Sequence, residues 1–135
     1  MTHRLTLRVY YEDTDLAGVV YYANYLRFIE RGRSEALRDI GVDQVAMKRD
    51  QGLVFVVRKL TVDYLSPAVF DDVLEIRTRI ARLRGASVEM MQEVWRAGTC
   101  LSRAAVTIAC MDDAGRPKRL PPDVKGRLEI LSNPE

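Results

Sequence analysis

Histidine is almost absent from this 135-residue chain, which contains a single one, His3. His3 lies next to the N-terminus, where we expect a mobile segment, so a Ser-His-Asp or Cys-His catalytic arrangement is not expected. Cysteine is scarce as well, with only Cys100 and Cys110. Because so few histidine and cysteine side chains are available, no cluster suits a transition metal, and we expect no metal site.

The two cysteines fall in one predicted strand and cannot easily meet there, so we expect reduced thiols in the core of a cytoplasmic protein. No apolar run approaches the length of a membrane-spanning helix, so we expect no membrane insertion. The net charge is only +2, which gives no strong field for a nucleic-acid partner. A glycine-rich phosphate loop is also missing, so we expect no nucleotide cofactor.

The composition is that of a folded globular chain, with 47% hydrophobic and 30% charged residues, and its length suits one domain, 1–135. Hydrophobic spacing predicts a long helix over 22–40, ended by Gly41, with its apolar stripe at Leu26, Ile29, Arg33, Leu37 and Ile40. Alternation predicts strands over 6–11, 53–65, 73–83, 87–96 and 100–111. Shorter helices are predicted over 42–50 and 120–131.

The order of these elements is a strand, a long helix and then four strands joined mostly by tight turns, which should form an antiparallel sheet. The helix can bury its apolar stripe if the sheet curves around it, which is the α+β arrangement of the hotdog fold. The segment 53–65 is apolar at both alternating positions, so we expect a central strand. A lone sheet would leave an edge exposed, and we therefore expect a homo-oligomer, a dimer or more fully a tetramer.

One segment, "YYEDTDLAGVVYYANY" over residues 10–25, combines three acids with an apolar run at the start of the long helix. The first backbone N–H groups of a helix lack partners and carry partial positive charge, so they can polarise a carbonyl oxygen. If the helix begins near Tyr22, Asp15 faces these groups across a gap. Asp15 could then attack the carbonyl carbon or take a proton from an attacking water, within the apolar walls of Leu16, Val19, Val20 and Tyr21.

Acids before a helix also serve as caps, and the residues alone leave both interpretations of this segment open. Glu30 on the helix is a rival catalytic carboxylate. Its alternative role is a set of helix-surface contacts with Ser34 and Arg27, which we favour.

The segments "YYEDTDLAGVVYYANYLRFIERGRSE" and "VVRKLTVDYLSPAVFDDVLEIRT" resemble the hotdog acyl-CoA thioesterases. They are similar to the 4-hydroxybenzoyl-CoA thioesterase family and especially to its Tol-Pal-associated bacterial branch. The resemblance covers the whole chain. It implies hydrolysis of an acyl-CoA to an acid and free coenzyme A, with no cofactor because coenzyme A is part of the substrate. An acyl carrier protein is an alternative carrier, and an acyl-CoA-binding module without turnover is the alternative function.

The resemblance also implies roles for single residues. The family's catalytic aspartate falls on Asp15, and the backbone amide that polarises the thioester falls on Tyr22, where the Tol-Pal-associated branch usually has histidine. Gly18 matches the glycine that lets the loop turn. We expect the substrate to be bound by Gly18, Val20, Tyr21, Asn24, Tyr25, Arg58, Lys59, Arg82 and Arg84, the basic residues holding the phosphates of coenzyme A.

Overall fold

The computed structural model describes residues 1–134; Glu135, the last residue of the predicted domain, lies outside them. The helical elements are the 3₁₀ turn η1 (Tyr11–Asp13), α1 (Asn24–Asp39), α2 (Gln44–Gln51) and α3 (Pro122–Ser132). The strands are β1 (His3–Arg8), β2 (Leu53–Tyr64), β3 (Val73–Leu83), β4 (Ser87–Arg96) and β5 (Thr99–Asp112). All the predicted helices and strands are therefore present; β3 and β4 have the predicted bounds, and the others have shifted ends.

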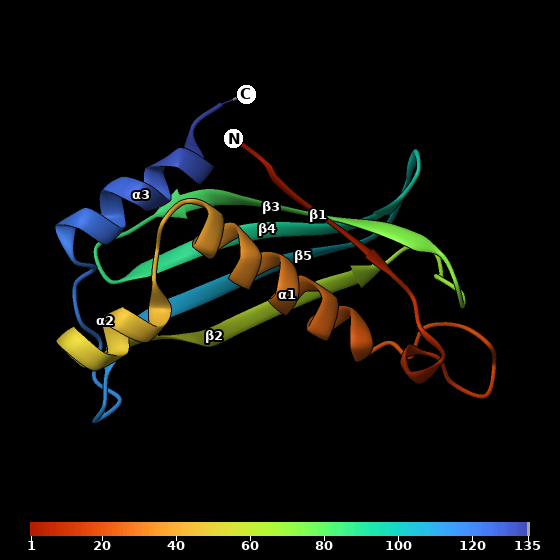
Figure 1. The fold of residues 1–135 in the computed structure, drawn as a ribbon, viewed down its shortest axis with the longest axis horizontal. Helices are drawn as coiled ribbons and strands as arrows, with labels where there is room; N and C mark the ends of the chain where they lie inside the picture. The colour runs from red at the N-terminus through yellow and green to blue at the C-terminus, as the bar shows by residue number, and fades with distance from the viewer. Residues whose placement is uncertain (135) are drawn as a thin grey trace.

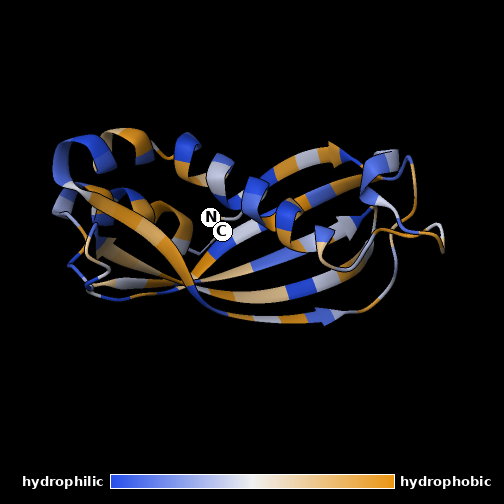
Figure 2. Ribbon diagram, turned by 90° about the horizontal axis from the view of Figure 1, so that it is seen from below, coloured by the Kyte–Doolittle hydropathy of each residue, from blue (hydrophilic) through white to orange (hydrophobic). Residues whose placement is uncertain are grey.

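The five strands form one antiparallel sheet in the order β1-β3-β4-β5-β2. The helix α1 lies across one face of this sheet, and α3 packs against β3 at the end where the two chain termini meet (Figure 1). Apolar and polar residues alternate along the strands (Figure 2), which gives the sheet a buried and an outer face. The predicted antiparallel sheet curved around one long helix is confirmed.

The helix α1 buries a wider face than the sequence pattern indicated. Ile29, Leu37 and the C-terminal Ile40 are buried as expected, whereas Leu26 and Arg33 are only partly buried. The rest of the buried face consists of Asn24, Tyr25, Phe28, Gly32 and Ala36. Two of these residues, Gly32 and Ala36, are small and let the helix axis approach the sheet closely. The position of the helix is therefore set by close packing as well as by the burial of hydrophobic area.

Gly32 marks the closest approach of α1 to the sheet. A Cβ atom at this position would lie 2.5 Å from Cγ2 of Ile76 and 3.3 Å from Oγ1 of Thr78. Ile76 is fully buried on β3 and β-branched, so its side chain cannot move aside cheaply. The spacing between the helix and β3 therefore depends on the absence of a side chain at position 32.

The N-terminal strand is displaced from its predicted position, because β1 covers residues 3–8 rather than 6–11. The chain leaves the sheet after Val9, and the Asp13 carboxylate then accepts a hydrogen bond of 2.8 Å from the Tyr10 backbone, which closes the η1 turn. The expectation of a mobile segment around His3 is wrong. His3 is a buried strand residue whose Nε2 lies 2.7 Å from Oδ2 of Asp39.

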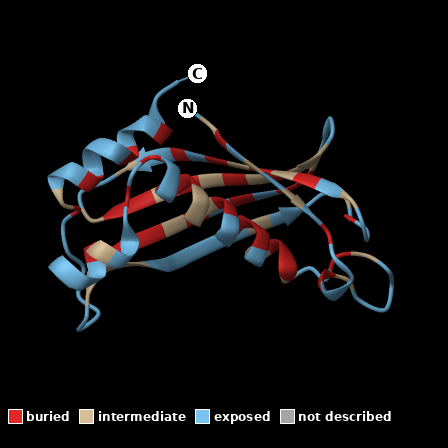
Figure 3. Cartoon of the chain, in the orientation of Figure 1, coloured by how far each residue is buried: buried red, intermediate tan, exposed pale blue. Residues whose placement is uncertain are grey.

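The strand β2 lies at the edge of the sheet, so the prediction of a central strand is wrong for the single chain. A β-bulge between Val57 and Lys59 explains the misleading pattern. Before the bulge the odd-numbered residues face the same side as Ile108 and Cys110, and after it the even-numbered residues Leu60 and Val62 do so. Most of β2 remains exposed (Figure 3), including its apolar outer residue Val56.

Cys100 and Cys110 are both free thiols, as predicted. Cys110 belongs to the core, whereas Cys100 is only partly buried. Burial raises the pKa of both thiols above the ordinary value for cysteine. Among residues 1–134, no helix combines the length and the apolar character needed to cross a membrane.

Two glycine substitutions should separate helix propensity from packing at Gly32. Gly32→Ala should lower the free energy of unfolding by about 1–2 kcal/mol, because overpacking against Ile76 outweighs the gain in helix propensity. Gly126→Ala is the matched control within α3, where nothing lies within 4 Å of the added Cβ, and it should raise stability by about 0.5–1 kcal/mol. Urea denaturation measures both values, and a stabilised Gly32→Ala protein would contradict the close approach.

Candidate active site

The segment between β1 and α1 is organised by Asp13, one of its three acids. The side chain of Asp13 is buried, and its two oxygens accept hydrogen bonds from the Tyr10 backbone N–H (2.8 Å) and from Nδ2 of Asn24 (2.9 Å). Its backbone oxygen accepts a third bond from the Tyr21 N–H at 2.9 Å. Asp13 thus joins the start of the loop to the start of α1.

Asp15 lies at the head of a tight turn in the same loop and is exposed to solvent. Its Oδ1 accepts a hydrogen bond from the Ala17 N–H at 2.9 Å, and its backbone oxygen accepts one from Gly18 at 3.0 Å. Gly18 has a φ of +82°, a conformation that residues with a side chain rarely adopt. Within residues 1–134, Oδ2 of Asp15 has no hydrogen-bond partner, so this oxygen is available to a reactant.

The helix α1 begins two residues later than predicted, at Asn24, and this places Tyr22 and Ala23 in the turn that leads into it. The Asn24 N–H is satisfied by the carbonyl of Tyr21 at 2.8 Å. In the described part of the chain, no acceptor pairs with the backbone N–H of Tyr22 or of Ala23. Unpaired amides at the start of a helix are the kind of donor that can polarise a carbonyl oxygen.

A cavity of about 260 Å³ opens beside these amides. It is lined by Val20, Tyr22, Tyr25, Tyr64, Leu65, Ser66 and Pro67. The Tyr64 hydroxyl donates a 3.0 Å hydrogen bond to the carbonyl oxygen of Tyr22, and its ring meets that of Tyr25 at 5.4 Å between centroids. The hydroxyl of Tyr25 accepts a 2.9 Å bond from the Ala68 N–H, which fixes the far wall of the cavity.

The surroundings of two phenols that line this cavity, and of a third beside it, raise their pKa values. Burial raises the pKa of Tyr25 and of Tyr64 above the ordinary value for tyrosine, with the neighbouring phenols adding to the effect at Tyr64. Beside them, the hydrogen bond with Tyr22 raises the pKa of Tyr21. Neutral phenols donate hydrogen bonds but do not act as bases, so a general base in this loop has to be a carboxylate.

The structure brings part of the predicted site together. Val20, Tyr22 and Tyr25 line the cavity, and Asp15, Gly18 and Tyr21 lie in the adjoining loop. Asn24 is buried and bound to Asp13, so it supports the loop from behind rather than lining this cavity.

The basic residues predicted to bind coenzyme A lie elsewhere on the chain. Arg58 and Lys59 are exposed at the bulge of β2. Arg82 and Arg84 are exposed at the end of β3, which is opposite the Asp15 loop in Figure 1, and Arg84 pairs with Glu89 at 3.1 Å. The length of β3 puts this end roughly 30 Å from the loop at the rise of an extended strand. A single protomer therefore does not gather all the predicted residues around one substrate.

Sequence reasoning missed two residues of the site, Tyr64 and Asp13. Tyr64 ends a strand far from the loop in sequence, and only the pairing of β2 with β5 brings it to the start of α1. The sequence did contain a signal for Asp13, because three acidic residues before the long helix are more than one N-terminal cap requires. Of the two contacts favoured for Glu30, the structure shows the one with Ser34, whose hydroxyl donates to the Glu30 carboxylate at 2.9 Å; among residues 1–134 no ion pair joins Glu30 to Arg27. Within the described residues, no group of histidine, cysteine and acidic side chains could hold a metal ion.

Comparison with known proteins places this geometry in a family. Residues 17–101 match the thioesterase superfamily, a stretch that starts just after Asp15 and includes Tyr22. The chain is 42% identical over 126 residues to the acyl-CoA thioesterase YbgC of Haemophilus influenzae, covering 93% of each protein. It is 45% identical over 123 residues to the acyl-CoA thioester hydrolase YbgC of Escherichia coli O6:H1, covering 90% of this chain and 91% of the relative.

The fold agrees with this relationship. The crystal structure of a probable thioesterase from Bartonella henselae superimposes with a TM-score of 0.85 at 44% identity, covering 90% of this chain and all of that one. The hotdog fold expected from the sequence is thereby confirmed. The family match spans more than half of the chain, and the curated relatives align along nearly its whole length. The chain therefore belongs to the thioesterase superfamily.

Proposed function

We propose that this chain hydrolyses acyl-CoA thioesters at the loop between β1 and α1, with Asp15 and the Tyr22 amide as its catalytic groups. The class of reaction follows from the family and its curated relatives, and the chain is an acyl-CoA thioesterase. The observation that supports the assignment of the site is the pair of unpartnered amides of Tyr22 and Ala23 beside a cavity, in the same loop as a carboxylate with one free oxygen.

In the proposed reaction the thioester carbonyl oxygen accepts hydrogen bonds from the Tyr22 and Ala23 N–H groups. Negative charge grows on that oxygen as the carbon becomes tetrahedral, and each well-placed donor contributes about 100-fold in rate. Asp15 either takes a proton from a water that attacks the carbon, or attacks the carbon itself. On both routes the C–S bond then breaks and coenzyme A leaves as a thiol after gaining a proton. On the direct route the acyl group stays on Asp15 as a mixed anhydride, which water hydrolyses to the free acid and the carboxylate.

The side chain of Tyr22 has a separate role from its amide. Its ring lines the cavity, and Tyr22 is 62% exposed. The ring packs edge-on against the ring of Tyr64, with 6.2 Å between the two ring centroids. We assign the ring to selection of the acyl group and the backbone to catalysis. Replacement of the histidine that is usual here in the Tol-Pal-associated branch would then change substrate preference and leave the reaction intact.

A dimer is part of the proposal. The strand β2 has one unpaired edge along its twelve residues and carries exposed apolar side chains, of which Val56 is 41% and Val57 46% exposed. Such an edge is a template for pairing with a second chain. Antiparallel pairing about a two-fold axis would bring the end of one protomer that carries Arg82 and Arg84 to the same end as the partner's Asp15 loop, which a substrate with a long phosphate-bearing arm requires.

The remaining parts of the proposal concern context. A tetramer, built from two such dimers, stays a prediction. The free thiols of Cys100 and Cys110 support a cytoplasmic location, where cysteines remain reduced. Coenzyme A is the proposed carrier, acyl carrier protein is the alternative carrier, and we propose that no cofactor is needed.

Asp15→Asn should reduce turnover by about 100-fold or more and leave the fold intact. The asparagine side-chain oxygen can still accept the bond from the Ala17 N–H, so the turn is preserved while the charge is lost. Release of free thiol from acyl-CoA measures the loss, and circular dichroism checks the fold. Glu30→Gln is the paired control and should retain most of the activity; near-normal hydrolysis by folded Asp15→Asn would falsify the assignment.

Tyr64→Phe should lower kcat by about fivefold, because it removes one hydrogen bond to the Tyr22 carbonyl and loosens the peptide that carries the Ala23 N–H. The ring packing against Tyr25 remains, so KM and the melting temperature should change little. Tyr11→Phe is the matched control, since Tyr11 is 82% exposed at the start of η1 and does not line the cavity. An unchanged kcat in Tyr64→Phe would remove Tyr64 from a positioning role.

Light scattering at micromolar concentration should report a dimer or a larger even assembly. Val56→Asp places a charge on the outer side of the edge strand, and we expect it to shift the protein toward monomers and to weaken coenzyme A binding along with turnover. Thr99→Asp, exposed at the start of β5 and not paired with β2, controls for adding a charge to the sheet as such. A wild-type protein that is monomeric and fully active would contradict the shared site.

A further inference from the structure

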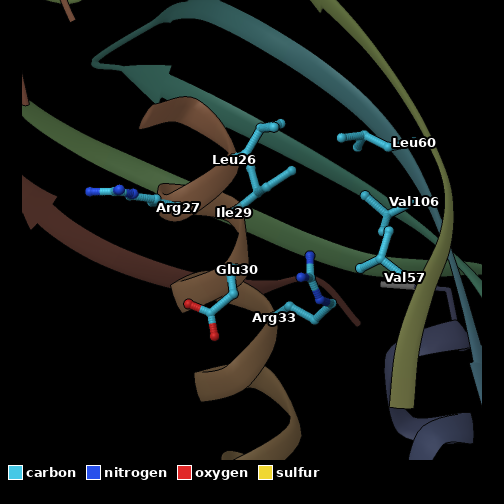
Figure 4. A pocket seen from close by; sticks show the side chains of 8 residues that line it. All are labelled: Leu26, Arg27, Ile29, Glu30, Arg33, Val57, Leu60 and Val106. Carbon is cyan, nitrogen blue, oxygen red and sulfur yellow. The ribbon is translucent and has the colours of Figure 1, made fainter. Parts of the chain in front are cut away.

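The segment that joins β2 to β3 supplies more of the proposed catalytic cavity than α1 does. Leu65, Ser66 and Pro67 of this segment line the cavity, whereas α1 contributes Tyr25 alone. Residues further along the helix line a separate groove of about 370 Å³ (Figure 4), and no residue of 1–134 lines both spaces. The shape of the cavity therefore depends on what holds the 65–72 segment in place.

Ala68 is the point at which this segment is joined to the site. It is fully buried, its N–H donates a 2.9 Å hydrogen bond to the hydroxyl of Tyr25, and its carbonyl oxygen accepts a 2.8 Å bond from the Val20 N–H. Both partners line the cavity. Because Val20 comes two residues before Tyr22, Ala68 also sets the path by which the chain reaches the proposed oxyanion amides.

The opposite sides of the same two peptide groups are held by an ion pair. Nη1 of Arg96, the last residue of β4, donates to the carbonyl oxygen of Pro67 at 3.1 Å and to Oδ2 of Asp72 at 2.9 Å. The same carboxylate oxygen accepts a 2.9 Å bond from the Val69 N–H. The peptide groups before and after Ala68 are thus each bonded through both N–H and carbonyl, one side to the ion pair and the other to the site.

The ion pair is partly sheltered from solvent. The side chain of Asp72 is 19% exposed and that of Arg96 37%, so water screens the pair less than a fully exposed one. Burial raises the pKa of Asp72, but the hydrogen bonds from Val69 and Arg96 outweigh it and leave the pKa below its ordinary value. A bond from a charged donor is stronger than one between neutral groups, and it polarises the peptide that accepts it. The Ala68 N–H is therefore a better donor to the hydroxyl beyond it.

We propose that Arg96 and Asp72 are positioning residues for thioester hydrolysis, acting through Ala68 on the cavity wall and on the turn that presents the Tyr22 amide. Neither side chain contacts the substrate. Loss of the pair would free Ala68 to shift, and Val20 would shift with it. Displacement of oxyanion donors by a fraction of an ångström weakens the bonds that develop in the transition state. This inference rests on the proposed function.

A neighbouring ion pair provides the matched comparison. Arg8 of β1 donates to the carbonyl oxygen and to Oδ1 of Asp71, each at 3.0 Å. It holds the same segment one residue before Asp72, and within residues 1–134 its bonds fall on neither peptide group of Ala68. If general loosening of the segment were the only effect, removal of Arg8 and removal of Arg96 would change the reaction equally.

The test measures thiol release by the full chain from butyryl-CoA, decanoyl-CoA and benzoyl-CoA. Arg96→Met should lower kcat by about tenfold, since small displacements of positioned groups cost up to about 100-fold, and KM should change little. Arg96→Lys keeps a charged donor and should recover part of kcat, whereas Arg8→Met should keep the wild-type kcat. A folded Arg96→Met protein with the kcat of Arg8→Met would overturn the inference. A wild-type chain that hydrolyses none of the three would instead overturn the proposed function.

Amide hydrogen exchange followed by NMR tests the same contacts without turnover. The N–H groups of Val20 and Ala68 should exchange about tenfold faster in Arg96→Met than in the wild type, and at the wild-type rate in Arg8→Met. Asp72→Asn keeps an oxygen for the Val69 N–H but loses the charge, so smaller changes in kcat and exchange are expected. It is the deciding variant if Arg96→Met does not fold. Unchanged exchange and kcat in folded Asp72→Asn would also overturn the inference.

Discussion

The buried carboxylate of Asp13 is the interaction on which the proposed site depends. A carboxylate loses hydration when it is buried, and here both of its oxygens recover hydrogen bonds, from the Tyr10 backbone and from the Asn24 side chain. These two partners stand at opposite ends of the functional loop. Binding them to one side chain brings Asp15 near the turn that starts α1, although neither Asp15 nor Tyr22 contacts Asp13 through its side chain.

The seating of α1 on the sheet is the second constraint, and it acts on the other side of the same helix. Gly32 lets the helix approach Ile76, and Gln92 fills the space beside it with hydrogen bonds to the helix carbonyl of Ile29 and to Thr78. A rigid polar contact at this depth fixes rotation as well as distance. It therefore determines which helix residues face β2, and so which side chains of α1 reach the cavity.

Much of the fold could be predicted from the sequence, because the alternation in β3, β4 and β5 and the period of α1 are local signals of burial. The position of β2 could not, since a bulge at Arg58 changes which residues face inward and imitates a strand buried on both sides. His3 was misjudged for a similar reason. It is a buried strand residue in contact with Asp39 at the far end of α1, and no local pattern indicates such a contact.

Some residues of the proposed site could be predicted from the sequence and others could not, and the difference again depends on their separation along the chain. The loop that carries Asp15, Gly18 and Tyr22 is continuous in sequence, so its residues could be grouped by inspection. Tyr64 enters through the pairing of β2 with β5, and no local pattern indicates it. The basic residues Arg82 and Arg84 could be named by resemblance, but their distance from Asp15 in one protomer becomes visible only when β3 is traced through the sheet.

Catalysis and selectivity place different demands on this chain, and the structure separates them. The proposed oxyanion donors are backbone amides, which survive any substitution that preserves the turn at Tyr22, so the chemistry can persist while side chains around it change. Under the proposed function, selectivity instead depends on the side chains that line the cavity. Of these, Val20, Leu65 and Pro67 offer only area and volume, which discriminate weakly between similar chains. The hydroxyls of Tyr25 and Tyr64 are engaged with the backbone at Ala68 and Tyr22, which leaves the exposed ring of Tyr22 as the side chain best placed to change the acyl preference.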